Sequence, residues 1–358
     1  MGGAEPMLLE MHKLFPSAPI CTSVYNAEKM PAFKNIDVRT TDLQTKLPKK
    51  LRYKHVLWPT LRAKSFRKLD LSEFDIIISF SSAEAKSVQK SRPGQIHIAY
   101  IHTPPRYYWS HYEEFRKEFN FGPLTPFIRP VIPFFVKKMR KLDLESTKDI
   151  DVFIANSTVT QQRIKAYYNK PSTVIHPPVE VSRFTPPPKG VREGYVLWGR
   201  HVPYKRFDLA IKAANNLGVK LTIAGTGPDT ERLKSLAGPT VTFVGRISDE
   251  ALVALAQHSK AFLFPNEEDF GISAVEALAA GTPVIAYEKG GALDIVQDGE
   301  TGVFFKEQTV NSLVEAIKRF ETLEFLPATL HRKAKRFDKG LFATKMQKIV
   351  SDQIQSTQ

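Results

Sequence analysis

Short apolar runs rich in β-branched residues alternate with helical patterns along the second half of the chain. Glycine or proline bounds most of these runs, as is typical of buried strands in a parallel sheet. The pattern predicts strands at residues 194–200, 220–224, 241–244, 261–265, 283–287 and 302–305, and helices at residues 207–217, 229–236, 249–258 (with Ser248 as N-cap) and 272–280. This alternation predicts a doubly wound α/β domain, which binds ligands at the carboxyl ends of its strands.

The first half shows the same alternation with less regularity. Its apolar runs predict strands at residues 74–80, 96–101 and 151–155, and a short strand at 174–176. The short strand lies in a proline-punctuated segment that is typical of a linker. We therefore expect two α/β domains, an N-terminal one over residues 1–175 and a C-terminal one over residues 176–337.

The formal charge of +14 is concentrated in the first half, where residues 1–150 carry 25 Lys and Arg against 15 Asp and Glu. A basic half beside a nearly neutral one suggests an anionic partner: nucleic acid, a membrane surface or a phosphorylated substrate. The alternative is that these charges are ordinary surface lysines exposed to solvent, with no anionic partner. No zinc spacing, RNP-like motif or basic heptad pattern supports nucleic acid.

The apolar stretches are far shorter than the roughly 20 residues that span a bilayer, and no signal-peptide pattern follows Met1. The single cysteine, Cys21, offers neither an internal disulfide nor a metal cluster. We therefore expect a cytoplasmic protein. Residues 127–142 mix Phe, Ile and Val with five Lys or Arg residues. This segment either lies on an anionic bilayer at the inner face of the membrane or packs on its own domain with a charged outer face.

Candidate chemistry follows the first two predicted strands of the second half. Arg200 and Lys205 come after the first strand, where two cations suit a diphosphate. Exposed basic loop residues are the plainer interpretation. Gly225 and Gly227 occupy the turn after the second strand, where small residues let a ligand approach the backbone, although many such turns contain this pattern.

A third group lies around the helix that follows residues 261–265. Glu268 is in the loop before this helix, Gly271 is at its start, and Glu276 is about one turn inside it. Amides at a helix start favour an anion, and a carboxylate accepts hydrogen bonds from vicinal hydroxyls. The group therefore suits a ligand rich in hydroxyls with a phosphate in its middle. Two solvated glutamates are the alternative.

Glu268 and Glu276 resemble the Glu-x7-Glu signature of the retaining glycosyltransferases of family 4, which have the GT-B fold of two facing Rossmann-like domains. Further stretches resemble the family in register: residues 199–205, 224–229, 244–250, 281–291, 298–302, 102–107, 156–157 and 174–179. The stretch at 102–107 most resembles a mannosyltransferase-like branch that builds bacterial surface polysaccharides. The resemblance covers almost the whole chain. It implies an α/β GT-B fold in which a C-terminal helix at about 338–358 packs back on the N-terminal, acceptor-side domain.

The resemblance also implies roles for the candidate residues. Arg200 and Lys205 would bind the donor diphosphate and stabilise its charge as it leaves. Glu276 would bind the nucleotide ribose, and Glu268 would contact hydroxyls of the donor sugar. The remaining donor-side positions are His102 near the 6-hydroxyl of the sugar (a structural histidine being the alternative), Arg246 beside the base, and Phe270, Gly271, Ile272 and Gly225 around the donor.

The implied activity is transfer of a hexose from a nucleotide sugar to a glycan or lipid-linked glycan acceptor in polysaccharide biosynthesis, with the anomeric configuration retained. Mannose from GDP-mannose is the first candidate. The family generally needs no bound metal, and the sequence has no Asp-x-Asp motif beside a strand end, so we expect no metal and no cofactor. Two alternatives are a nucleotide-sugar epimerase of the same architecture and a catalytically inactive protein that binds nucleotide sugars.

Members of the family usually open with a strand before a glycine-rich turn. Residues 2–5 resemble this turn, and a helix pattern through Met7 and Leu14 follows directly. The first strand of a doubly wound sheet lies in its middle, so its loss would leave a gap with exposed edges that favour aggregation. We therefore expect a chain that lacks the first strand, is shortened relative to the functional protein, and is poorly soluble or inactive.

Overall fold

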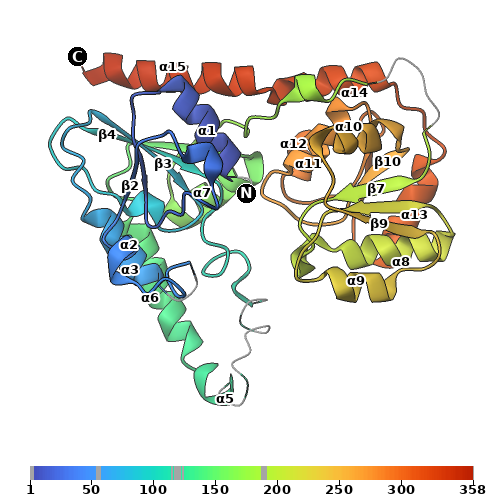
Figure 1. The fold of residues 1–358 in the computed structure, drawn as a ribbon, viewed down its shortest axis with the longest axis horizontal. Helices are drawn as coiled ribbons and strands as arrows, with labels where there is room; N and C mark the ends of the chain where they lie inside the picture. Colours follow the sequence, from blue (N-terminus) through green and yellow to red (C-terminus); the bar gives the residue numbers. More distant parts are fainter. Residues whose placement is uncertain are drawn as a thin grey trace. The chain divides into compact units, whose positions relative to one another are not determined.

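The computed structural model describes residues 4–53, 58–113, 116, 122, 125–186 and 192–357. The chain divides into two compact units. The N-terminal unit consists of Met1–Ile175 with Ala343–Gln358, and the C-terminal unit consists of His176–Phe342. Parallel strands form the centre of each unit (Figure 1).

The C-terminal unit is built on one parallel sheet, in which the described strands follow the order β12-β11-β10-β7-β8-β9. These strands are β7 (Tyr195–Trp198), β8 (Leu221–Ala224), β9 (Val241–Gly245), β10 (Ala261–Phe264), β11 (Val284–Tyr287) and β12 (Gly302–Phe305). Each lies where the sequence predicts a strand. The expected α/β architecture is confirmed in this unit.

Helices cover both faces of this sheet because side chains alternate along each buried strand. Tyr195 and Leu197 of β7 join a core with residues of α8 and α13, whereas Val196 and Trp198 join a second core with residues of α11 and α14. The helices are α8 (Phe207–Leu217), α9 (Thr230–Leu236), α10 (Asp249–His258), α11 (Ile272–Ala279), α12 (Ala292–Ile295), α13 (Val310–Phe320) and α14 (Pro327–Ala334).

Local sequence explains where these helices begin and end. Ser248 caps α10, as predicted, by accepting a hydrogen bond of 3.2 Å from the N–H of Ala251. Gly218 ends α8 in the left-handed region, with φ of 65°. The helices predicted at residues 207–217 and 249–258 are confirmed at both ends.

The N-terminal unit has parallel strands in two separate sheets. One sheet has the order β3 (Ile76–Ser81), β4 (Ile96–Ile101), β5 (Val152–Ala155) and β6 (Thr173–Val174). The other is a pair, β1 (Ile20–Thr22) with β2 (Val38–Thr40). Within the described residues, these strands do not form one continuous sheet. Gly2 and Gly3, the centre of the expected glycine turn, lie outside the described residues.

The predictions for this unit need two corrections. The short strand ends at Val174 and not at His176, because the His176 ring stacks on Phe270 of the C-terminal unit at a centroid distance of 5.3 Å. The strands β1 and β2 were missed, because three residues each are too few to show a period of two. The strands expected at 74–80, 96–101 and 151–155 are confirmed.

Helices surround these strands, including one formed by the predicted apolar pattern at the start of the chain, whose Met7 and Met11 are buried. They are α1 (Ala4–Leu14), α2 (Leu43–Lys46), α3 (Pro59–Arg67), α5 (Thr125–Ile128), α6 (Ile132–Glu145), α7 (Thr158–Tyr168) and α15 (Lys339–Thr357), which belongs to this unit from Ala343 on. Within the described part of the chain, no helix has both the length and the apolar character needed to cross a bilayer.

A buried ion pair ties α6 to the body of the N-terminal unit. Lys86 Nζ lies 2.6 Å from Asp143 Oδ1, and the two side chains are only 1% and 6% exposed. The second oxygen of Asp143 accepts hydrogen bonds of 2.8 Å from the Trp109 indole and from the Tyr168 hydroxyl. Several partners therefore offset the cost of burying this carboxylate.

Candidate active site

The loop after β7 carries Lys205 toward the carboxyl edge of the C-terminal sheet. Lys205 ends a short 3₁₀ turn, Pro203–Lys205, and the next residue, Arg206, has a φ of 53°. A left-handed conformation is uncommon for a residue with a side chain, and such strain is enriched at functional sites. The guanidinium of Arg206 donates to Asp208 and to Gln308, which stabilises this turn.

The loop after β10 carries Glu268 to the same edge. The N–H of Gly291 donates a 2.8 Å hydrogen bond to the carbonyl oxygen of Glu268. A Cβ atom at Gly290 would lie 2.3 Å from that oxygen, so only glycine fits there. The two glycines after β11 therefore position the backbone of Glu268.

Lys205 and Glu268 form an ion pair at this edge. Lys205 Nζ lies 2.6 Å from Glu268 Oε1, and both side chains are 17% exposed. Burial disfavours the lysine charge, but the Glu268 carboxylate outweighs that effect and raises the pKa of Lys205. The cation is thus charged at neutral pH and still reaches solvent.

Glu276 lies on α11 near Lys205 and accepts hydrogen bonds from two other side chains. Its Oε2 accepts from the Trp198 indole at 3.2 Å, and its Oε1 lies 3.5 Å from Arg183 Nη2. Burial raises the pKa of Glu276, although the indole N–H and the guanidinium oppose this shift. The pKa of Lys205 responds to Glu276 as well as to Glu268, which brings the two predicted glutamates and the predicted lysine into one cluster.

The glycines in the turn after β8 are needed for the packing of two loops. Gly225 has a φ of 113°, and a Cβ atom there would lie 2.0 Å from the carbonyl oxygen of Gly199. A Cβ atom at Gly227 would lie 2.2 Å from the carbonyl oxygen of His201. Both glycines therefore let this turn pack against the backbone of the loop that leads to Lys205. The close backbone approach is to another loop of the protein.

The residues at the start of α11 have their side chains packed or lack one. The Phe270 ring is buried and lies against His176 and Phe337, so it contributes to the core. Gly271 is the N-cap with a φ of 107° and makes no side-chain capping bond, and Ile272 is partly buried. The positive end of the helix thus lies next to Glu268 in the chain, an arrangement that favours an anion.

Two predicted cationic residues lie exposed at the same edge of the sheet. Arg200 follows β7 and Arg246 follows β9. Neither side chain makes a hydrogen bond or ion pair with another residue of the described part of the chain. His102 belongs to the N-terminal unit, where it follows β4 and its ring lies 5.5 Å from the Tyr100 ring.

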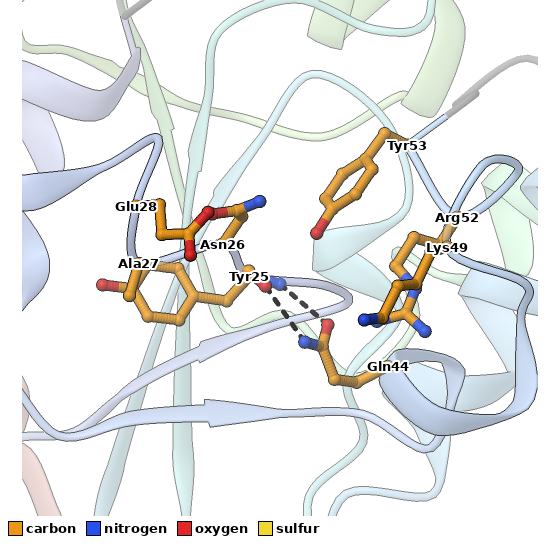
Figure 2. A pocket seen from close by; sticks show the side chains of 8 residues that line it. All are labelled: Tyr25, Asn26, Ala27, Glu28, Gln44, Lys49, Arg52 and Tyr53. Carbon is orange, nitrogen blue, oxygen red and sulfur yellow. Dashed lines mark hydrogen bonds between the residues drawn. The ribbon is translucent and has the colours of Figure 1, made fainter.

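A cavity of about 460 Å³ lies in the N-terminal unit, where β1 and β2 end. Figure 2 shows the Gln44 amide hydrogen-bonded to both backbone groups of Tyr25, each at 3.0 Å. Arg52 donates two hydrogen bonds to the carbonyl of Leu47, which keeps its charge beside the cavity. The lining residues are Tyr25, Asn26, Ala27, Glu28, Gln44, Lys49, Arg52 and Tyr53.

Sequence reasoning missed Trp198 and Arg183, the two donors to Glu276. Trp198 looks like an ordinary apolar residue of a buried strand, and its N–H has no sequence pattern. Arg183 lies 93 positions before Glu276, so no local spacing links them. Among the described residues, no group of three or more His, Cys, Asp or Glu side chains lies together as metal ligands.

Comparison with known proteins relates this geometry to a family. Residues 182–337 match the family described as glycosyl transferases group 1. Over 209 residues the chain is 32% identical to D-inositol 3-phosphate glycosyltransferase of Mycolicibacterium smegmatis, covering 51% of this chain and 48% of the relative. Over 198 residues it is 30% identical to the GDP-mannose-dependent alpha-(1-6)-phosphatidylinositol monomannoside mannosyltransferase of Mycobacterium tuberculosis, covering 47% and 51%. The chain thus spans about half the length of these relatives.

Solved structures match over nearly the whole chain. Anabaena HepE in complex with UDP matches with a TM-score of 0.70 at 17% identity, over 98% of this chain and 96% of that one. Sucrose-phosphate synthase of Thermosynechococcus elongatus matches with a TM-score of 0.68 at 20% identity, over 89% and 84%. At such identities the match shows the fold, which is the expected GT-B fold with two Rossmann-like units. The similarity to the glycosyl transferases group 1 family lies within the C-terminal unit, at residues 182–337.

Proposed function

We propose that this chain is a glycosyltransferase that moves a hexose from a nucleotide sugar to an acceptor hydroxyl and retains the anomeric configuration. The observation that carries the proposal is the Lys205–Glu268 ion pair with Glu276 beside it, in the unit that matches the family. A cation between two carboxylates suits a diphosphate that joins two hydroxyl-rich sugars.

Lys205 and Arg200 bind the diphosphate in this proposal. Arg200 is exposed and offers a fork of donors, and Lys205 adds a positive charge that burial has not suppressed. As the bond between the sugar C1 and the diphosphate breaks, both cations stabilise the negative charge that develops. The acceptor oxygen bonds to C1 on the same face, and its proton passes to the leaving phosphate.

The two carboxylates bind the two sugars. Glu276 accepts hydrogen bonds from the ribose hydroxyls, and its orientation is set by the Trp198 indole. Glu268 accepts from hydroxyls of the transferred hexose, with the backbone at Gly271 and Ile272 alongside. His102 contacts the hexose near its 6-hydroxyl, and Arg246 lies beside the base.

GDP-mannose is the first candidate donor. One relative described above is named as GDP-mannose-dependent, which supports this donor, and the UDP complex of HepE supports nucleoside diphosphate binding by this fold. For the acceptor we propose a glycan or lipid-linked glycan in polysaccharide biosynthesis. The cavity at Tyr25 and Tyr53 combines two aromatic rings with two amides, two cations and the Glu28 carboxylate. The rings and cations suit a sugar that carries an anionic group, and the amides and the carboxylate suit its hydroxyls.

Donor binding tests the first half of the proposal. Thermal unfolding should be measured with GDP, GDP-mannose, UDP-glucose and UDP-N-acetylglucosamine, since a ligand that binds only the folded state raises the melting temperature. We expect GDP-mannose to give the largest shift, and Glu276→Gln to reduce it while Glu231→Gln, on exposed α9 surface, leaves it unchanged. No shift with any of these nucleotides would overturn the proposal.

Turnover tests the second half. Released GDP and the fate of the sugar should be followed with and without a mannose-containing glycan acceptor. Transfer predicts GDP release that depends on acceptor, whereas an epimerase predicts an altered nucleotide sugar without transfer. A binding protein without activity predicts a melting shift and no product.

A further inference from the structure

Four large apolar side chains are exposed close together in the N-terminal unit, in α5 and at the start of α6. Phe127 is 77% exposed, Val131 58%, Phe134 75% and Phe135 47%. Figure 1 shows that α5 and this end of α6 extend away from the strands of their unit. An exposed apolar group of this size marks a surface that contacts a partner or a membrane. We call these four residues the apolar tip.

Phe134 of the apolar tip does not belong to the face by which α6 packs on its unit. That face carries Val136 and Met139, both 4% exposed, and the anchored Asp143. Phe134 lies on the opposite face, which it shares with Lys138 and Lys141 because the three are spaced i, i+4 and i+7. Phe134 therefore has no role in the packing of α6 on this unit.

Basic side chains surround the apolar tip. Lys137, Lys138 and Lys141 are exposed, and none of them forms an ion pair with another residue of the described ranges. Elsewhere on the surface, lysines such as Lys46 and Lys348 pair with an aspartate four positions away. The positive charge of these three lysines is therefore available to bind an anionic partner.

We propose that the apolar tip inserts into the surface of an anionic bilayer while Lys137, Lys138 and Lys141 contact the lipid phosphates. Aromatic side chains next to lysines on one helix face are typical of helices that bind membrane interfaces. Three unpaired lysines complement a negatively charged lipid surface, and the exposed apolar side chains can enter the interfacial region of the bilayer. The inference goes beyond the proposed function and does not rest on it.

The anchoring of α6 supports this use. The helix has 14 residues, about 21 Å at 1.5 Å per residue, and its far end is fixed by the buried Lys86–Asp143 pair. Phe134 and Phe135 of the apolar tip are consequently presented on an anchored helix. A rigid element loses less conformational freedom on binding than a mobile one.

Co-sedimentation with vesicles tests the proposal. The purified chain should be mixed with phosphatidylcholine vesicles that contain either no anionic lipid or 30 mol % phosphatidylglycerol, at low and at physiological salt. We expect binding to the anionic vesicles, weakened by salt because the lysines contribute through charge.

Two variants with matched controls separate the apolar contribution from the basic one. Phe127→Ser with Phe134→Ser should weaken binding at least tenfold, whereas Leu293→Ser with Leu326→Ser, at two exposed apolar positions of the C-terminal unit, should not. Replacing Lys137, Lys138 and Lys141 by Gln should weaken binding by about a hundredfold, at about fivefold per lysine. The same change at exposed Lys34, Lys50 and Lys64 should have little effect.

Insertion has its own readout. In the Phe134→Trp variant, the fluorescence added relative to the parent should shift to the blue with anionic vesicles and be quenched by brominated acyl chains. Each of three results would overturn the proposal: no sedimentation with anionic vesicles at low salt, equal loss in the variants and their matched controls, or no quenching of the added fluorescence in bound protein. Self-association through the apolar tip without vesicle binding would assign this surface to a protein contact instead.

Discussion

Lys205 with Glu268 in the C-terminal unit and Lys86 with Asp143 in the N-terminal unit are ion pairs of the same length, 2.6 Å. Their surroundings differ. The first pair is 17% exposed on both sides and lies where strands end, whereas the second is almost completely buried and Asp143 has two further hydrogen-bond donors. A ligand can replace one partner of the first pair but cannot reach the second. Exposure and unfilled hydrogen-bonding capacity therefore distinguish a binding cluster from a structural one.

The largest expected effect tests the structural pair. Lys86→Met leaves Asp143 buried without its cation, so we expect a loss of about 3–5 kcal/mol in the free energy of unfolding. Urea denaturation measures this loss. The matched control is Lys90→Met, which removes a partner from Asp151 at a more exposed position and should cost less than about 1 kcal/mol. Equal losses of unfolding free energy in Lys86→Met and Lys90→Met would show that the buried ion pair is no more important for stability than the exposed one.

The next largest expected effect is a pH dependence of stability that comes from one buried histidine in each unit. Burial lowers the pKa of His97 from 6.5 to about 4, and it lowers the pKa of His201 as well. The unfolded chain therefore binds more protons between pH 6.5 and about 4, so stability is complete above pH 6.5 and falls as the pH decreases through that range. For His97 the loss is about 3 kcal/mol.

The measurement is the difference in unfolding free energy between pH 7.5 and 4.5. His97→Asn should make this difference smaller, and His258→Asn, at an exposed position on α10, should not. A pH dependence that is identical in the parent and in His97→Asn would contradict the assignment.

Removing the cation of the exposed pair should change activity more than stability. We expect Lys205→Ala to lower turnover at least tenfold, about 1.4 kcal/mol of barrier, because the leaving diphosphate loses a counter-charge. Lys212→Ala, on the exposed side of α8, is the control. Full activity in Lys205→Ala and also in Arg200→Ala would show that neither residue binds the diphosphate.

The smallest effect concerns the indole that donates to Glu276. Trp198→Phe removes this hydrogen bond, so we expect donor affinity to fall about fivefold, or about 1 kcal/mol. The N–H also lowers the pKa of Glu276, so its loss should raise that pKa and move the acid limb of kcat/KM to higher pH. An unchanged acid limb would show that Trp198 has no influence on Glu276.

The two units also differ in how far sequence reasoning reaches. In the C-terminal unit, continuous apolar strands bounded by Gly or Pro predict the sheet, and Ser248 and Gly218 set helix ends locally. The N-terminal unit depends on contacts distant in sequence, such as Lys86 with Asp143, and its strands β1 and β2 are too short to leave a pattern.

The candidate site shows the same limit. The sequence predicts Lys205, Glu268 and Glu276 as site residues because they lie in the loops after two strands or in the first turns of the following helix, where the chain pattern marks the sheet edge. Trp198 and Arg183 reach Glu276 only after folding, and the reason for Gly225 is visible only once two loops are packed together. Spacing in the sequence thus identifies candidate binding groups at a sheet edge more readily than the side chains that donate hydrogen bonds to them.

The Lys205–Glu268 pair has a further consequence for selectivity. An anion that approaches Lys205 competes with a carboxylate already 2.6 Å away. Inorganic phosphate or ATP offers no hexose to Glu268 and must leave that carboxylate without its cation. In the complex proposed above, a nucleotide sugar would separate the same pair but give the freed carboxylate hydroxyl donors in return. Competition from the Glu268 carboxylate would therefore weaken the binding of anions that carry no hexose, so that the site selects nucleotide sugars already at the binding step.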